Sequence, residues 1–121
     1  MILCDRFADS TVAYQGAGHG IAPEVVRDIT SIVVGDTWPT ITLLLDLPTD
    51  VGLKRAAIRY EDQQENRFER LGIDFHQRLR DGYLALAKAY PNRFTLVEAN
   101  GDIPTVQQNI LVALNNFAER R

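Results

Sequence analysis

The sequence predicts an α/β fold in which parallel strands form a sheet with helices on both of its faces. Two short apolar runs, residues 1–4 and 43–45, are each followed directly by an aspartate. A run that is apolar at consecutive positions needs cover on both faces, as in a parallel sheet. Segments with an apolar stripe at helical spacing alternate with such runs. With 121 residues, 45% of them apolar, the chain is expected to form one domain, residues 1–121.

The first strand is expected at residues 1–4, and Asp5 and Arg6 follow where this strand would leave the sheet. Ligands bind at that edge in open parallel sheets. If the chain turns helical after Arg6, polar side chains recur at helical spacing along one face and its border. These residues are Arg6, Ser10, Thr11, Tyr14 and Gln15. A guanidinium, hydroxyls, an amide and a ring together suit a nucleotide.

Residues 16–20 are rich in glycine. The Gly-Lys-Ser/Thr sequence that ends a phosphate-binding loop does not follow them, so we expect them to form a turn. Pro23 opens the next helix and Gly35 closes it. Its apolar stripe is expected to pack against the rest of the domain, and consists of Val25, Ile29, Ile32 and Val33. Residues 41–47 are expected to form a central strand, with Asp46 supporting the loop after it.

The second half alternates in the same way. Thr49 or Asp50 can cap a helix, and residues 59–70, almost wholly polar, predict a solvated connection on composition alone. An apolar stripe from Leu71 to Tyr90 predicts a long amphipathic helix. A strand over residues 94–97 and a last helix capped by Asp102 complete the chain.

Charge and composition exclude several functions. A net charge of −3 and a pI near 5.3 argue against a surface for nucleic acid polymers or anionic membranes. No apolar run approaches the roughly 20 residues that span a bilayer. Cys4, the single cysteine, is predicted to be buried and inert, and His19 and His76 are isolated, so no metal site is expected. We therefore expect a cytoplasmic protein.

The string Asp5-Arg6-Phe7, then Ser10, then Ala13-Tyr14-Gln15-Gly16 resembles the signature of bacterial thymidylate kinases, and the resemblance runs the whole length of the chain. A lone Asp-Arg pair is more simply a surface ion pair, but the longer ordered string favours the family. The resemblance implies that Asp5 and Arg6 act at the phosphate of dTMP. It also implies that the nucleoside is contacted by Ser10, Thr11, Tyr14 and Gln15.

The resemblance further implies an arginine-bearing lid at about residues 59–70. In this view Arg59 and Arg67, with Arg55 behind them, lie at the ATP phosphates and screen charge during phosphoryl transfer. Asn66 departs from the Asp-Arg-Phe-Glu pattern of the lid, which weakens the expected support of Arg67. Ala99 and Asn100 would lie against the adenine of ATP, although an ordinary strand-to-helix turn explains them equally well. ATP and Mg²⁺ are the implied cofactors.

The resemblance implies a fold of the P-loop kinase type. Such a kinase holds the ATP phosphates in a Gly-x-x-x-x-Gly-Lys-Ser/Thr loop. No such string occurs in these 121 residues. We therefore expect a truncated sheet without the strand that precedes this loop, which the family places between the strands ending at Asp5 and Asp46. Either those two strands close up, another chain supplies a strand, or the chain is a piece of a longer polypeptide. Little catalysis is expected from these residues alone.

The leading hypothesis is thus a thymidylate kinase portion that carries the dTMP signature and the lid, from an enzyme that converts ATP and dTMP to ADP and dTDP. The alternative is a non-catalytic module that binds a nucleotide weakly or forms a homodimer through residues 22–34 and 71–90. A related deoxynucleoside kinase is disfavoured by residues 13–16.

Overall fold

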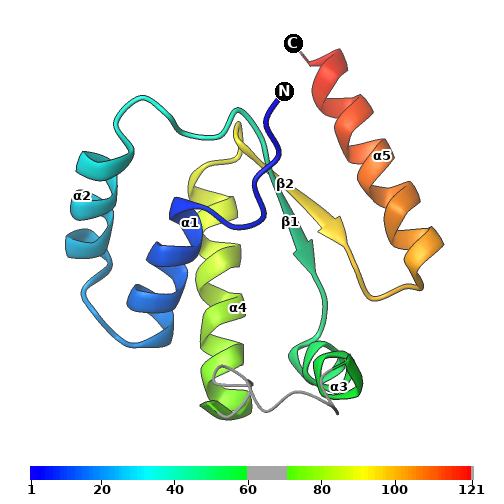
Figure 1. The fold of residues 1–121 in the computed structure, drawn as a ribbon, viewed down its shortest axis with the longest axis horizontal. Coiled ribbons are helices and arrows are strands. Elements are labelled where there is room, and N and C mark those ends of the chain that lie inside the picture. Colours follow the sequence, from blue (N-terminus) through cyan, green and yellow to red (C-terminus); the bar gives the residue numbers. More distant parts are fainter. Residues whose placement is uncertain (60–70, 121) are drawn as a thin grey trace.

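The computed structural model describes residues 1–59 and 71–120, which form helices around a small parallel sheet (Figure 1). The elements in chain order are α1 (Ala8–Thr11), the π-helix η1 (Val12–Gly18), α2 (Pro23–Val34), β1 (Thr42–Asp46), α3 (Thr49–Arg59), α4 (Gly72–Ala89), β2 (Phe94–Glu98) and α5 (Ile103–Glu119). Among the described helices, none is both long enough and apolar enough to cross a membrane.

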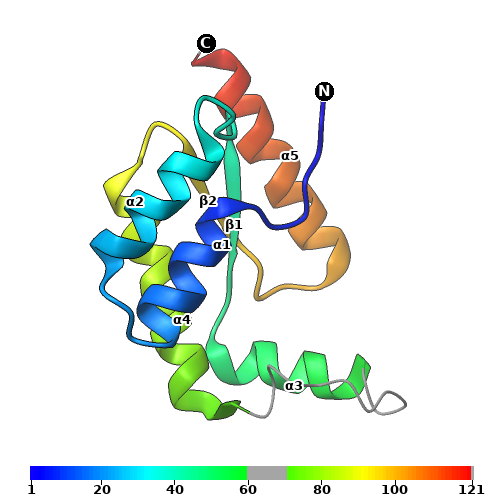
Figure 2. The same ribbon diagram turned by 60° about the vertical axis from the view of Figure 1, so that its left-hand side comes forward.

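The sheet consists of β1 and β2, which run parallel with Thr42 opposite Phe94 and Asp46 opposite Glu98. The strands predicted at residues 41–47 and 94–97 are thus confirmed. Figures 1 and 2 show α4 on one side of this sheet and α5 on the other. The described sheet has two strands only, and Leu45 and Leu96 on them are 46% and 54% exposed. The expected larger sheet with helices covering both faces therefore stays a prediction.

The predicted strand at residues 1–4 is wrong. These residues form no strand, and their side chains are exposed, including Cys4, which was predicted to be buried. An extended segment becomes a strand only when its backbone N–H and C=O groups pair with a neighbour. Within the described residues β1 and β2 pair only with each other, so residues 1–4 have not closed up against β1.

The core lies between α4, η1 and the sheet. Its buried apolar residues are Val12, Ala13, Val26, Phe75, Leu79, Leu86 and Phe94. The long amphipathic helix is confirmed, since α4 buries the middle of its predicted stripe. Gly82 faces η1 so closely that a Cβ there would lie 2.4 Å from the Cβ of Ala17. Small residues on both helices therefore allow α4 and η1 to approach.

The ends of α2 follow the predicted signals, because the helix begins at Pro23 and stops at Gly35, whose φ is 54°. Its packing does not follow the prediction. The side chains that α2 buries are Val26, Thr30 and Val34. The predicted stripe faces solvent instead, and Ile32 and Val33 are 83% and 80% exposed. The stripe thus stays uncovered within the described chain.

The turn predicted at residues 16–20 and the helix cap predicted at Asp102 have opposite outcomes. The turn predicted at residues 16–20 is partly wrong, because η1 continues to Gly18 and the amide of His19 donates to Tyr14 O at 2.9 Å. The cap predicted at Asp102 is confirmed, since its Oδ1 accepts from the amide of Thr105 at 3.0 Å and α5 starts there.

Candidate functional site

Arg6 and Tyr14 form the centre of the candidate site. Nη1 of Arg6 donates a hydrogen bond to the Tyr14 hydroxyl at 3.1 Å, and the guanidinium carbon lies 5.4 Å from the centroid of the Tyr14 ring. Arg6 has φ 65°, the left-handed region that a residue with a side chain enters at a cost of about 1 kcal/mol or more. Strain of this kind often accompanies a functional position, because contacts must hold it.

The prediction placed Arg6 and Tyr14 on one face of a single helix, but the structure brings them into contact in another way. Arg6 precedes α1, which begins at Ala8, and Tyr14 lies in η1. A π-helix closes its hydrogen bonds one residue later than an α-helix and is concentrated at functional sites. The left-handed Arg6 and the wider winding of η1 together bring the guanidinium over the ring.

Ser10 joins this site through a residue that the sequence did not single out. The hydroxyl of Tyr83, from α4, donates to Ser10 Oγ at 2.8 Å. Burial raises the pKa of Tyr83, and the hydrogen bond to Ser10 opposes this shift only in part. The sequence showed Tyr83 only as one member of an apolar stripe, because a partner 73 residues away leaves no local signal.

The charge on Arg6 is secure. Partial burial works to lower the pKa of its guanidinium, but Tyr14, Tyr83 and Asp5 together raise that pKa above its ordinary value. Arg6 is therefore a cation at neutral pH. The remaining predicted dTMP residues, Asp5, Thr11 and Gln15, are exposed near this pair in the chain.

Three of the five residues predicted to meet ATP, namely Arg55, Ala99 and Asn100, come together at the carboxyl end of β2. Nη1 of Arg55 donates to Ala99 O at 2.8 Å, and its Nη2 donates to the carbonyls of Asn100 and Gly101, both at 2.9 Å. Arg55 thus holds the turn after β2. Arg59 is the exposed last residue of α3, whereas Arg67, Asn66 and the rest of the predicted lid at residues 60–70 lie outside the described residues.

Asp46, which was predicted to support the loop after β1, pairs with a residue of α4. Arg80 of α4 donates from Nε and Nη2 to the two carboxylate oxygens of Asp46, at 2.8 and 2.9 Å. The hydrogen bond from Arg80 lowers the pKa of Asp46. This pair ties the carboxyl end of β1 to α4.

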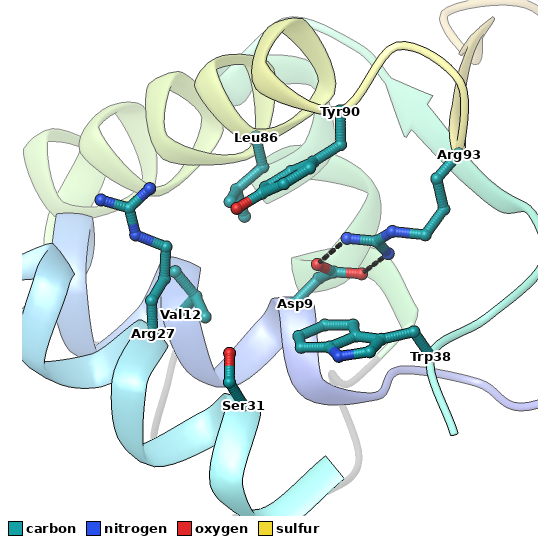
Figure 3. A pocket seen from close by; sticks show the side chains of 8 residues that line it. All are labelled: Asp9, Val12, Arg27, Ser31, Trp38, Leu86, Tyr90 and Arg93. Atoms are coloured by element: carbon teal, nitrogen blue, oxygen red, sulfur yellow. Dashed lines mark hydrogen bonds and ion pairs between the residues drawn. The ribbon is translucent and has the colours of Figure 1, made fainter. Parts of the chain in front are cut away.

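A pocket of about 320 Å³ lies on another face of α1 (Figure 3). Arg93 donates from Nη1 and Nη2 to the carboxylate of Asp9, at 2.5 and 2.8 Å, and the rings of Trp38 and Tyr90 flank the pair. Both charges are largely buried, with 9% of the Asp9 side chain and 17% of the Arg93 side chain exposed. The pair joins α1 to the residue before β2, and no pattern in the sequence predicted this contact.

Comparisons with known proteins agree on one family. The family model described as thymidylate kinase matches residues 1–110 of this chain. The chain is also similar to a crystal structure of thymidylate kinase from Ehrlichia chaffeensis, with 30% identity and a TM-score of 0.65, over 93% of this chain and 47% of that one.

Curated relatives named thymidylate kinase are more similar in sequence. The protein from Geobacter sp. (strain M21) is 49% identical over 84% of this chain, and that from Citrifermentans bemidjiense is 46% identical over 93%. These alignments cover 47% and 50% of the two relatives. The chain therefore spans about half the length of the curated relatives it matches.

Proposed function

The chain belongs to the thymidylate kinase family, and we propose that it supplies the dTMP-binding part of the reaction that transfers the γ-phosphoryl group of ATP to dTMP. The contact between Arg6 and Tyr14 carries this proposal. A guanidinium fork binds a phosphate through paired N–H donors, and the ring beside it offers a flat surface to the sugar or base. Arg6 lies just before α1, and Tyr14 lies in η1, which follows α1 directly.

Each side chain of the site has a proposed role. Arg6 binds the phosphate of dTMP, and Asp5 orients this acceptor or the water around the metal ion. Tyr14 packs against the sugar, where it disfavours a 2'-hydroxyl. The nucleoside is further contacted by Ser10, Thr11 and Gln15. Because phosphoryl transfer spreads negative charge over the transferred group, Arg59 and Arg67 are proposed to screen that charge.

ATP is proposed to lie at the turn after β2. There Arg55 fixes the carbonyls of Ala99 and Asn100, so that this turn offers a rigid edge for the adenine. The Mg²⁺ that accompanies ATP neutralises charge on its phosphates. The 121 residues contain no phosphate-loop string, so we expect negligible turnover from them alone. The larger P-loop kinase sheet of the family and a cytoplasmic location are parts of the same proposal.

Two assays on this chain test the proposal. In a titration followed by ¹H–¹⁵N NMR, dTMP should cause saturable shifts at residues 5–15 and leave α5 unchanged. An ADP-release assay with ATP and dTMP should give no rate above background. Titration without shifts would refute dTMP binding, and ordinary kinase turnover would refute the expected inactivity.

A second candidate function, formation of a homodimer, is favoured by the apolar stripe that α2 leaves exposed. Val25, Ile29, Ile32 and Val33 form it, and contiguous exposed apolar surface commonly marks an interface. Sedimentation analysis should show a dimer that Ile32→Glu dissociates. Ile58→Glu is a matched control, because Ile58 is also exposed, at 73%, but lies on α3. A native chain that sediments as a monomer at all concentrations would exclude this function.

A further inference from the structure

Tyr83 of α4 contacts the candidate site through its hydroxyl oxygen, which bonds to Ser10. Its ring packs against the buried cluster between α4 and η1, and its hydroxyl is 2.8 Å from Ser10 Oγ. Burial is the main cause of the raised pKa of Tyr83; Tyr14 also raises this pKa, and Arg6 lowers it. Tyr83 is therefore fixed by packing in a position from which it contacts the site through Ser10.

The direction of this hydrogen bond follows from the chemistry of the two hydroxyls. A phenol is far more acidic than an aliphatic alcohol, so the Tyr83 O–H donates and Ser10 Oγ accepts. A serine hydroxyl can accept through its lone pairs but has one proton to donate. With an acceptor position taken by Tyr83, that proton points elsewhere. Among the described residues, the Ser10 hydroxyl donates to no partner.

We propose that Tyr83 is a positioning residue that makes Ser10 a hydrogen-bond donor toward an oxygen acceptor of the bound nucleoside. This inference rests on the proposed function, since it concerns how the same site recognises dTMP. It adds a directional element that Arg6 does not provide. Arg6 attracts the phosphate by charge. Ser10, oriented by Tyr83, selects a nucleoside that has an oxygen acceptor within reach of the Ser10 hydroxyl.

The proposal fits the placement of the two residues on different elements. Ser10 lies in the short helix α1, and Tyr83 lies in the middle of the long helix α4. A short helix alone does not fix a serine rotamer against solvent, because the free hydroxyl can rotate. The rigid phenol supplies that restraint from outside the helix.

A double-mutant cycle on the 121-residue chain tests the inference, with dTMP affinity measured by NMR titration. Tyr83→Phe removes only the phenolic oxygen and should weaken dTMP binding by about 2- to 10-fold, the range for one neutral hydrogen bond. Ser10→Ala should weaken it by at least as much. In the Ser10→Ala background, Tyr83→Phe should cause no further loss, because Tyr83 acts through Ser10.

Three further measurements make the test specific. Tyr90→Phe, at the residue that follows the same helix and in the pocket of Figure 3, should leave dTMP affinity unchanged. Thymidine, which lacks the phosphate, should show the same fold-loss with Tyr83→Phe. Equal melting temperatures for Tyr83→Phe and Tyr90→Phe would show that a change in stability does not explain the loss.

The outcomes separate this inference from the proposed function. Native dTMP affinity in Tyr83→Phe, or losses that add in the double variant, would overturn the role of Tyr83 while leaving the dTMP site intact. A loss with dTMP but not with thymidine would overturn the assignment of the acceptor to the nucleoside. If the unaltered chain showed no saturable dTMP binding, the proposed function would fail, and the role of Tyr83 with it.

Discussion

Asp9 and Ser10 are neighbours on α1, yet their side chains enter two clusters of opposite character. Asp9 faces the pocket of Figure 3 and is enclosed with Arg93, while Ser10 bonds to Tyr83 in the candidate site that also contains the exposed Arg6. In the first cluster both carboxylate oxygens are bonded, and Arg93 also donates to Thr42 Oγ1 at 3.1 Å. In the second, the groups are exposed or half-buried.

The difference separates stability from binding. In a buried ion pair whose carboxylate oxygens are already hydrogen-bonded, few polar atoms remain to bind a ligand. Removing one residue of the pair leaves the other charge buried without a partner. Exposed cations and hydroxyls contribute little to folding, because water solvates them in the unfolded chain as well. We therefore expect changes at Arg93 to act on folding and changes at Arg6 to act on binding.

The largest expected effect is that of Arg93→Met. It leaves the Asp9 carboxylate buried without its partner, which should lower the free energy of unfolding by about 3 kcal/mol or more. Urea unfolding at neutral pH measures this loss. Arg27→Met is the matched control, because Arg27 lines the same pocket but its contact with Glu24 is exposed and 3.8 Å long. Its effect should stay below about 1 kcal/mol.

The comparison fails if Arg93→Met is as stable as the native chain, or if it abolishes dTMP binding in the folded fraction.

Gly82→Ala should disturb the packing of α4 against η1 beside the cluster of Ser10 and Tyr83, because Gly82 precedes Tyr83 and lies against Ala17 of η1. The new methyl group would lie 2.4 Å from the Ala17 Cβ, so α4 and η1 must separate. We expect a loss of about 2 kcal/mol in the free energy of unfolding. The double variant Ala17→Gly, Gly82→Ala should recover part of this loss in thermal unfolding. No recovery would mean that this contact is not the cause.

A smaller effect is expected at Asp46, whose pair with Arg80 is intermediate in exposure. Because the folded pKa of Asp46 is lowered by the hydrogen bond from Arg80, its contribution is full above the unfolded pKa of 3.8. It is lost as the pH falls further, through the folded pKa. Asp46→Asn should thus cost about 1 kcal/mol at pH 7 and progressively less below pH 4. A cost independent of pH would contradict this cause.

The parts of the fold that the sequence predicted correctly depend on local signals. Pro23, Gly35 and Asp102 mark helix ends by their own backbone or side-chain chemistry, and the apolar run ending at Asp46 marks a strand. The strand at residues 1–4 was predicted wrongly because pairing requires a partner that a local pattern does not reveal. The stripe of α2 was misjudged for the same reason: periodicity identifies an apolar face but not what covers it.

The candidate site was predicted in part. Helical spacing suggested that Arg6 and Tyr14 share a face, and they are in contact, although through a left-handed residue and a π-helix. Tyr83, Arg93 and Arg80 were missed as partners of Ser10, Asp9 and Asp46. Each of these contacts joins residues at least 34 positions apart, and no local pattern encodes it.

The central claim is that the Arg6 guanidinium binds the phosphate of dTMP. Its most direct test is the dTMP affinity of Arg6→Gln relative to the native chain, with Lys54→Gln as a control for net charge. Loss of a charged hydrogen bond predicts affinity about 10- to 100-fold weaker for Arg6→Gln, with native affinity in Lys54→Gln. Equal affinity in Arg6→Gln and the native chain would contradict the claim.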